Sequence, residues 1–150
     1  RGSYNNERKK LRPFIGVLFE VNNCEYFAPL SSPKPKHLKM KNTIDFLKID
    51  GGKLGAINFN NMIPVNKENY ELIDLYKKHL TKAETKYQEL LRHQLDWLNA
   101  NYIQVKIKSS KLYKFYNQNK LSKHIKSRCC NFKLLEEKCL EYNKKYQNVS

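Results

Sequence analysis

The hydrophobic pattern of this chain changes its period near the middle, and this change constrains the fold more than any other feature. Before residue 66, short runs of β-branched and aromatic residues alternate with turn residues, which is typical of antiparallel strands. From residue 70 onward, apolar residues recur at helical spacing. Strands followed by helices predict the α+β class, and 150 residues without an internal repeat or a linker predict a single domain.

The strand-like runs are expected to pair as hairpins in series. Asn22 and Asn23 form the first turn, and Asp50-Gly51-Gly52 forms the second. The last run is expected to be an edge strand, because Pro64 cannot donate a hydrogen bond to a ladder. Such a series predicts a meander or a small, partly barrel-like sheet, with residues 31–41 as a loop. The expected strands are residues 14–21, 25–30, 44–49, 54–59 and 62–65.

The helical half begins with a short helix expected over residues 70–75. Thr81 is expected to cap a longer helix, because Glu84 three residues later completes the capping-box pattern. Residues 99–101 are expected to interrupt that helix, and Asn131 can cap a last one. The expected apolar faces are Tyr87, Leu90, Leu91, Leu95 and Leu98, then Tyr102, Val105, Leu112, Phe115 and Tyr116, then Leu134, Leu135, Cys139 and Tyr142.

Charge is distributed unevenly along the chain. Lys and Arg number 29 against 14 Asp and Glu, a formal net charge of +15, which is typical of proteins with a polyanionic partner. Acidic residues are absent from 97–135 and from 26–44. The positive charge is therefore expected to gather on one side of the protein, where a polyanion would bind. The alternatives are a merely soluble lysine-rich protein and a binder of anionic membranes. The cations expected to contact phosphate are Lys9, Lys10, Lys36, Lys39, Lys106, Lys108, Lys111, Lys114, Lys120, Lys123, Lys126 and Arg128.

Three aromatic residues lie among the lysines of the acid-free stretch. Tyr113, Phe115 and Tyr116 belong either to the core or to a platform on which bases stack. No apolar run approaches the ~18 residues of a membrane span, and no secretory segment opens the chain. The four cysteines lack C-x-x-C spacing and a histidine pair, so we expect no metal site and four reduced thiols in a cytoplasm.

The loop after the second expected strand is the most promising chemical site. Within seven positions it holds Ser31, Ser32, Lys34, Lys36 and His37, and two prolines restrict its freedom. RNA cleavage without a metal needs removal of the 2′-OH proton, cationic stabilisation of the phosphorane, and compensation of charge on the 5′-oxygen. This loop offers groups for each role. The alternative is a solvated turn with incidental lysines.

The roles can be distributed by residue type. Lys34 and Arg12 suit the stabilisation of a phosphorane, and His37 or Tyr4 suits proton transfer. Ser32 is expected to orient the substrate or to relay a proton, because a serine hydroxyl is a poor base unless a neighbour accepts its proton.

Four stretches resemble a known family in the same order along nearly the whole chain. They are FIGVL at 14–18, EYFAPLSSPK at 25–34, NNMIPV at 60–65 and CCNFKLLEEKC at 129–139. Together they resemble the ToxN/AbiQ family, the toxins of type III toxin–antitoxin systems. The resemblance implies a compact, partly barrel-like antiparallel sheet similar to the MazF/Kid toxins, with added C-terminal helices.

The resemblance also implies an activity and its partners. It implies a bacterial, cytoplasmic endoribonuclease that needs no metal or cofactor and leaves 2′,3′-cyclic phosphate and 5′-OH ends. Its substrates would be cellular or phage RNA, with a role in abortive infection. A repetitive antitoxin RNA would be cut into pseudoknots that inhibit the toxin in a closed protein–RNA assembly. The alternative is a non-catalytic, basic RNA- or DNA-binding module.

The family's site residues carry over one by one. Ser32 matches the key active-site serine, Ser31 the neighbouring hydroxyl, and Lys34 the lysine two residues beyond the serine. Tyr4 matches an active-site tyrosine.

The family also has an active-site lysine just before the Phe-Ile-Gly strand. Lys9, Lys10 or Arg12 can fill its place, and Arg12 fits by its distance from Phe14. The family's N-terminal strand and helix have no counterpart before Arg1, so we expect residues 1–150 to form a single toxin domain without them.

Overall fold

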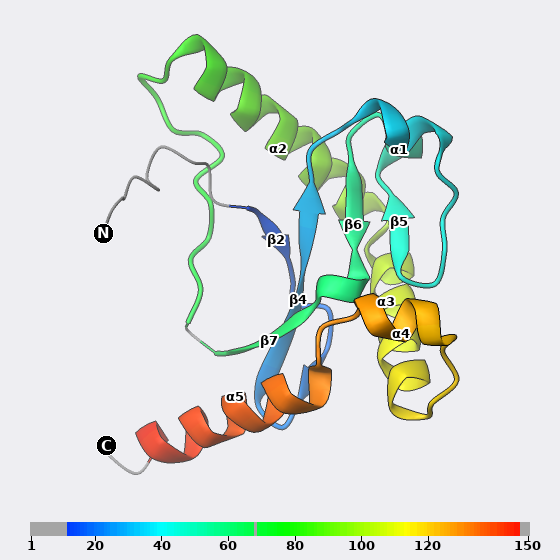
Figure 1. Cartoon of the computed structure of the whole chain (residues 1–150). Coiled ribbons are helices and arrows are strands. Elements are labelled where there is room, and N and C mark those ends of the chain that lie inside the picture. The colour runs from blue at the N-terminus through cyan, green and yellow to red at the C-terminus, as the bar shows by residue number, and fades with distance from the viewer. Residues whose placement is uncertain (1–11, 68, 148–150) are drawn as a thin grey trace.

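The computed structural model describes residues 12–67 and 69–147, and one long strand, β4 (Cys24–Ser31), organises it (Figure 1). Both edges of β4 carry partner strands, so that the described residues form a six-stranded antiparallel sheet. β3 and β7 pair with its first half, whereas β2 and β6 pair with its second half. The other strands are β2 (Phe14–Ile15), β3 (Glu20–Val21), β5 (Phe46–Lys48), β6 (Ala56–Asn58) and β7 (Ile63–Asn66).

Both expected hairpins are confirmed. Asn22 and Asn23 turn the chain between β3 and β4 with positive φ angles of 51° and 67°, which asparagine tolerates better than most residues. Between β2 and β3 the chain stays beside β4, because the Tyr26 N–H donates to the Phe19 carbonyl at 2.9 Å. The short 3₁₀ segment η1 (Asp50–Gly52) lies between β5 and β6, which pair in register from Phe46 to Lys48.

The expected meander is wrong at β7. A second 3₁₀ segment, η2 (Phe59–Asn61), follows β6 and places the buried Phe59 side chain in the core. β7 then pairs with β4, with Phe27 opposite Ile63. Within the described part of the chain β5 pairs with β6 alone, so the sheet is open there rather than closed like a barrel.

The expected loop at 31–41 contains a short helix, α1 (Pro35–Lys39). Proline suits the first helical position, because its missing N–H would have no partner there in any case. Pro35 therefore starts this helix rather than preventing it, which corrects the expectation.

Four helices follow the sheet, and the sequence correctly indicates where most of them begin. Thr81 Oγ1 accepts the Glu84 N–H at 3.1 Å, which confirms the expected capping box. Asn101 separates the second helix from the third, and Asn131 Oδ1 accepts the Leu134 N–H at 3.1 Å at the start of the last. The helices are α2 (Lys82–Ala100), α3 (Tyr102–Asn117), α4 (Lys123–Arg128) and α5 (Phe132–Gln147).

The helix expected over residues 70–75 does not form. Asp74 Oδ1 accepts the Tyr76 N–H at 3.0 Å, a local bond that competes with helical hydrogen bonding. Side chains of α2 hold the segment instead, because Arg92 Nη1 donates to the Leu75 carbonyl at 2.7 Å.

The core lies between the sheet and one side of the helices. Leu98 of α2, Val105 and Leu112 of α3, and Phe132 of α5 are buried with the strand residues. The expected apolar faces are partly wrong, because the residues at their margins point outward. Leu95, Tyr102, Leu134 and Tyr142 each keep 36% or more of their surface exposed.

The expectation of four reduced thiols is wrong for one pair. A disulfide joins Cys24 at the start of β4 to Cys139 of α5, with their Cα atoms 6.4 Å apart. α5 packs against β4 and β7 and brings together two residues that are 115 positions apart in sequence. Cys129 and Cys130 are free, half-buried thiols. None of the helices in the described residues is long and apolar enough to cross a membrane.

Candidate active site

A cleft of about 440 Å³ lies beside α1, at the end of β4 that carries Ser31. It lies between the end of β4, α1 with the loops on either side of it, the start of β5, the region of β6 and η2, and the last residue of α4. The residues that line it are Ser31, Lys34, Lys36, His37, Met40, Lys41, Thr43, Phe46, Asn58, Asn60 and Arg128.

Ser31 is held by a side chain that sequence reasoning missed. Its Oγ accepts a hydrogen bond of 2.7 Å from Asn58 Nδ2, and Asn58 lies on β6 next to the strand end. Because an amide N–H donates this bond, the Ser31 hydroxyl keeps its own proton for donation. Ser32, the next residue, is exposed and is not among those that line the cleft.

His37 organises the start of α1. Its Nδ1 accepts the backbone N–H of Lys34 at 3.1 Å, and its own N–H donates to the Lys34 carbonyl at 2.9 Å. The neutral imidazole therefore carries its proton on Nε2. The side chain is buried, and that burial together with the charges of Lys36 and Lys34 lowers the pKa of His37. His37 is thus a neutral side chain that fixes the start of α1 through Nδ1 and can donate a hydrogen bond from Nε2.

The glycine-containing segment η1 packs directly against the backbone of α1. Gly52 of η1 has a φ of +96°, and a Cβ there would lie 2.5 Å from the His37 carbonyl oxygen. The backbone of α1 therefore approaches η1 more closely than any side chain at that position would allow.

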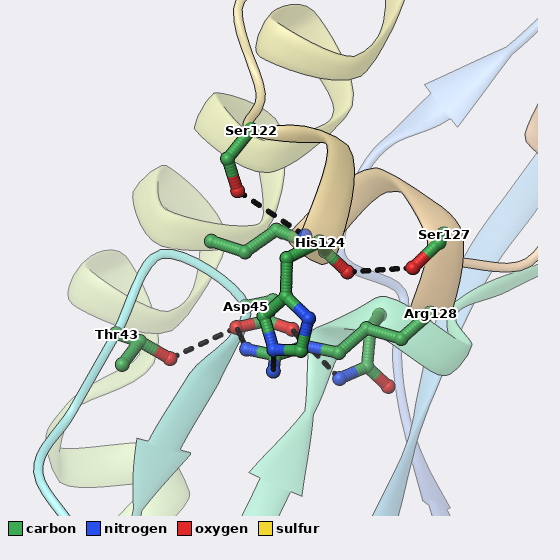
Figure 2. Close-up of polar contacts among 8 residues, drawn as sticks. Thr43, Asp45, Ser122, His124, Ser127 and Arg128 are labelled. Atoms are coloured by element: carbon green, nitrogen blue, oxygen red, sulfur yellow. Dashed lines mark hydrogen bonds and ion pairs between the residues drawn. The ribbon is translucent and has the colours of Figure 1, made fainter.

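On another side of the cleft, Asp45 holds Arg128 (Figure 2). The Asp45 side chain is fully buried, and Arg128 donates to it through Nε at 2.5 Å and Nη2 at 2.7 Å. Thr43 Oγ1 and Asn60 Nδ2 donate to the same carboxylate at 2.9 and 2.8 Å. Burial would raise the pKa of Asp45, but these three donors and the guanidinium charge lower it to about 2. Asp45 is therefore ionised.

The cleft is strongly positive. Lys34, Lys36, Lys41 and Arg128 line it, and none of its described lining residues carries a carboxylate. A concave surface lined by one sign of charge concentrates the opposite sign. The cleft is therefore suited to a polyanion, with the hydroxyl of Ser31 and the imidazole of His37 beside it.

The structure gathers part of the predicted site. Ser31, Lys34, Lys36, His37 and Arg128 meet in one cleft, although Arg128 was expected with the helical lysines. Predicted residues that are exposed and do not line the cleft are Arg12, Ser32 and Lys39. The predictions for Tyr4, Lys9 and Lys10 fall outside the described residues.

Arg12 nevertheless lies near the end of β4. The Pro13 carbonyl accepts the Leu30 N–H at 2.9 Å, which continues the pairing of β2 with β4 by one residue. Arg12 therefore directly precedes Pro13, which is hydrogen-bonded to Leu30, the neighbour of Ser31.

Several lining residues and the Asp45 carboxylate behind them are not among the residues predicted from the sequence. A signal for the amides existed, because Asn58, Asn60 and Asn61 crowd together in the NFNN run. Lys41 lies in the acid-free stretch 26–44, but no pattern there sets it apart from its neighbours. Nothing in the sequence marks Asp45 as part of a site, because an aspartate within the expected strand 44–49 is typical of a solvent-facing position.

A second, shallower groove of about 340 Å³ runs along α3. It is lined by Lys106, Ile107, Ser110, Lys111 and Lys114, three of which are predicted phosphate contacts. The aromatic stripe beside them belongs mainly to the core. Tyr113 and Tyr116 pack on Phe132, with ring centroids 6.1 and 4.7 Å away.

The other predicted helical cations are not equivalent. Lys126 Nζ donates to Asn119 Oδ1 at 2.7 Å and lies over the Tyr116 ring. Lys111 and Lys120 both lie over the Phe115 ring. Burial, followed by the charge of Lys111, lowers the pKa of Lys108, which is half-buried.

The described residues contain no group of three or more His, Cys, Asp or Glu side chains arranged to hold a metal ion. The cleft therefore offers hydroxyl, amide, imidazole and cationic groups as its chemistry.

Comparison with known proteins finds relatives that are toxins or endoribonucleases of type III toxin–antitoxin systems. The endoribonuclease ToxN of Bacillus thuringiensis subsp. kurstaki is 35% identical over 148 residues, which cover 96% of this chain and 75% of that protein. A chain solved in work on selective toxin inhibition by a non-coding RNA pseudoknot in bacterial type III systems is 33% identical, with a TM-score of 0.71. That match covers 93% of this chain and 84% of the other.

A third relative is AbiQ, a lactococcal anti-phage endoribonuclease of a type III toxin–antitoxin system. It superposes with a TM-score of 0.67 at 27% identity, covering 87% of this chain and 79% of AbiQ. Residues 2–140 match the family described as toxin ToxN, type III toxin–antitoxin system. The cationic cleft, the shared fold and this match over most of the sequence place the chain in the ToxN toxin family.

Proposed function

We propose that this protein is an endoribonuclease toxin that cleaves RNA by attack of a 2′-OH on the adjacent phosphodiester. The observation that carries the proposal is the cleft in which Lys34, Lys36, Lys41 and Arg128 surround the hydroxyl of Ser31. A pentavalent phosphorane carries more negative charge than the diester, so cations fixed in advance stabilise the transition state more than the substrate.

The reaction needs no water and no change of oxidation state. The 2′-OH gives its proton to a base as its oxygen bonds to phosphorus, and the bond from phosphorus to the 5′-oxygen breaks. The leaving 5′-oxygen takes up a proton. The products are a 2′,3′-cyclic phosphate and a 5′-OH, and we propose that the reaction requires neither metal nor cofactor.

Roles follow from the contacts and from the family resemblance. Lys34 faces the phosphate, because it lines the cleft at the start of α1. Ser31 donates to a phosphate oxygen with the proton that its bond from Asn58 leaves available. His37, neutral and protonated on Nε2, is suited to donate a hydrogen bond to the 5′-oxygen or to a phosphate oxygen. Ser32 matches the family's key serine.

Residues around the cleft complete the proposed substrate site. Arg12 lies near the Ser31 end of β4, and Lys36 and Lys39 extend the positive surface along α1. Tyr4, Lys9 and Lys10 are assigned to the site by the resemblance alone.

The antitoxin is proposed to be an RNA pseudoknot repeat that the toxin itself processes. In a related type III system the toxin is selectively inhibited by a non-coding RNA pseudoknot. The phosphate contacts are assigned to Lys106, Lys108, Lys111, Lys114, Lys120, Lys123 and Lys126 on α3, α4 and the turn between them. An RNA unit that crosses these helices on one toxin and presents its end to the cleft of the next toxin makes heterologous contacts. Such contacts close into a ring or continue as a filament, and the family resemblance favours the closed protein–RNA ring.

Cellular or phage RNA is the proposed substrate in the bacterial cytoplasm, with abortive infection as the outcome, by analogy with the anti-phage relative AbiQ. The likeness of the sheet to the MazF/Kid toxins stays a prediction.

The test is to incubate the protein with RNA in EDTA and to map both ends of the products. We expect cleavage to persist and to yield cyclic phosphate and 5′-OH ends. Cleavage that is lost on chelation, or products with 3′-OH ends, would contradict the mechanism. Binding without any cleavage would favour the alternative of a non-catalytic RNA-binding module.

The same assay tests the serine assignment. Ser32→Ala is expected to abolish cleavage while affinity for the antitoxin RNA stays close to that of the wild type, because one hydroxyl adds little beside many cations. Toxicity retained by Ser32→Ala in cells without antitoxin would contradict the assignment.

A further inference from the structure

Arg128 is fixed in place by a carboxylate that lies behind the cleft rather than in it. The fully buried Asp45 carboxylate holds Nε and Nη2, while 40% of the Arg128 side chain stays exposed. Arg128 Nη1 lies 3.3 Å from His124 Nε2, one turn earlier on α4. Figure 2 shows the Arg128 guanidinium beside the Asp45 carboxylate, with the His124 ring next to the guanidinium.

The guanidinium retains donors for another partner. A guanidinium has five N–H groups, and Asp45 and His124 engage at most three of them. The remaining N–H groups belong to a side chain that lines the cleft with Ser31, Lys34 and His37. A planar fork held from behind by a carboxylate is suited to bidentate recognition of a phosphate.

The surroundings of Asp45 set this pair apart from an ordinary surface ion pair. Thr43 and Asn60 complete its hydrogen bonds, so the carboxylate stays charged even though it is removed from solvent. Three segments distant in sequence therefore converge to fix a single guanidinium at the edge of the cleft.

We infer that Arg128 is a catalytic residue that donates two N–H groups to the non-bridging oxygens of the scissile phosphate, and that Asp45 is its positioning residue. The inference rests on the proposed function. As the 2′-oxygen bonds to phosphorus and the bond to the 5′-oxygen breaks, charge on the non-bridging oxygens rises and then falls. A guanidinium fixed at these oxygens therefore acts mainly on the transition state.

The first test compares single-turnover cleavage by Arg128→Ala and Arg128→Lys with that by Lys86→Ala, which removes one exposed charge from α2. We expect Arg128→Ala to slow cleavage about 10²- to 10³-fold. Affinity for an uncleavable 2′-O-methyl oligonucleotide should change far less. Arg128→Lys should be intermediate, because it keeps the charge but loses the fork. Guanidinium ion added to the buffer should restore part of the lost rate in Arg128→Ala.

The second test separates positioning from folding. Asp45→Asn should slow cleavage, yet the double variant Asp45→Asn/Arg128→Ala should be no slower than Arg128→Ala alone, because Asp45 acts through the arginine. The double variant also removes the uncompensated buried charge, and so serves where Arg128→Ala does not fold. Rates are normalised to the folded fraction, measured by circular dichroism at the assay temperature.

Two outcomes overturn the inference in distinguishable ways. Wild-type cleavage together with an undiminished rate per folded molecule in the arginine variants would reject the role of Arg128 and leave the proposed function intact. Strictly additive losses from Asp45→Asn and Arg128→Ala would reject the positioning role. A wild-type protein that binds RNA but does not cut it would overturn the proposed function and the inference with it.

Discussion

The carbonyl oxygen of Ser31 occupies the space that a Cβ atom on Gly55 would need. The carbonyl carbons of Ser31 and Ser32 lie 3.1 and 3.2 Å from that position, and Gly55 has a φ of +101°, which L side chains rarely adopt. The backbone that carries both candidate serines therefore rests directly on this glycine.

Gly55→Ala is expected to displace the serine loop and lower the cleavage rate about 10²-fold, the cost of a misplacement near 1 Å. Gly51→Ala is the matched control, because Gly51 also has a positive φ of 64° but nothing lies within 4 Å of its Cβ position. The control should lose about 1–2 kcal/mol of unfolding free energy to backbone strain and keep its rate per folded molecule. Equal activity in both variants would show that the contact does not position the loop.

The first hairpin and the capping box could be predicted because their causes are local. Asn22 and Asn23 supply turn chemistry at the bend, and Thr81 with Glu84 carries both halves of its cap within one turn. The cleft was found for the same reason, since Ser31, Lys34 and His37 are close neighbours in the chain.

The missed features depend on residues that are far apart in sequence. Asp45 and Arg128 are separated by 83 positions, and only the packing of α4 beside η2 brings them together. The same applies to the disulfide of Cys24 with Cys139. The order of residues along the chain does not reveal such pairs. Arg128 was therefore expected to contact phosphate together with the neighbouring lysines rather than to line the cleft.

His37 should make the stability of the protein depend on pH. Because burial and two lysines lower its pKa below 6.5, the unfolded chain binds a proton that the folded protein resists. Stability should therefore be lost as the pH falls through about 6.5 toward 5.

His37→Gln should lose less stability than the wild type over this range, because glutamine can accept the Lys34 N–H but does not titrate. Melting temperatures from about pH 7 to about pH 5 would measure the difference. His93→Gln, which replaces an exposed histidine on α2, should follow the wild-type curve. Parallel curves for all three proteins would show that His37 does not contribute.

Glu136 ties α5 to two other elements. The hydroxyls of Tyr26 on β4 and Tyr113 on α3 each donate to Glu136 Oε2 at 2.5 Å. Burial and the hydrogen bond to Glu136 raise the pKa of Tyr113 to about 12.

Glu136→Ala leaves both hydroxyls without this acceptor and should cost about 3 kcal/mol of unfolding free energy in urea denaturation. Glu137→Ala removes the same charge from an exposed position and should stay within about 0.5 kcal/mol of the wild type. Equal losses in the two variants would show that the tyrosine contacts do not stabilise the fold.

The lysine groove of α3 should account for part of the salt dependence of antitoxin binding. Each phosphate contact contributes ~0.7 to the slope of log affinity against log salt for single-stranded nucleic acid, and ~0.9 for a duplex. Replacing Lys106, Lys111 and Lys114 with Gln should therefore flatten the slope by about 2, with cleavage of short RNA less affected.

The control replaces Lys82, Lys86 and Lys138, which are exposed on α2 and α5, with Gln. It changes the net charge equally. Identical slopes for the two triple variants would show that the groove lysines form only a solvated face.

The most direct measurement of the proposed mechanism uses RNA oligonucleotides that differ in one atom. A substrate with a single 2′-deoxy nucleotide immediately 5′ to the scissile phosphate is compared with the all-RNA strand in EDTA. Without the 2′-oxygen no cyclic phosphate can form, so we expect cleavage at that position to vanish while the all-RNA strand is cut. Cleavage of the 2′-deoxy strand at the same bond and at an undiminished rate would contradict the mechanism.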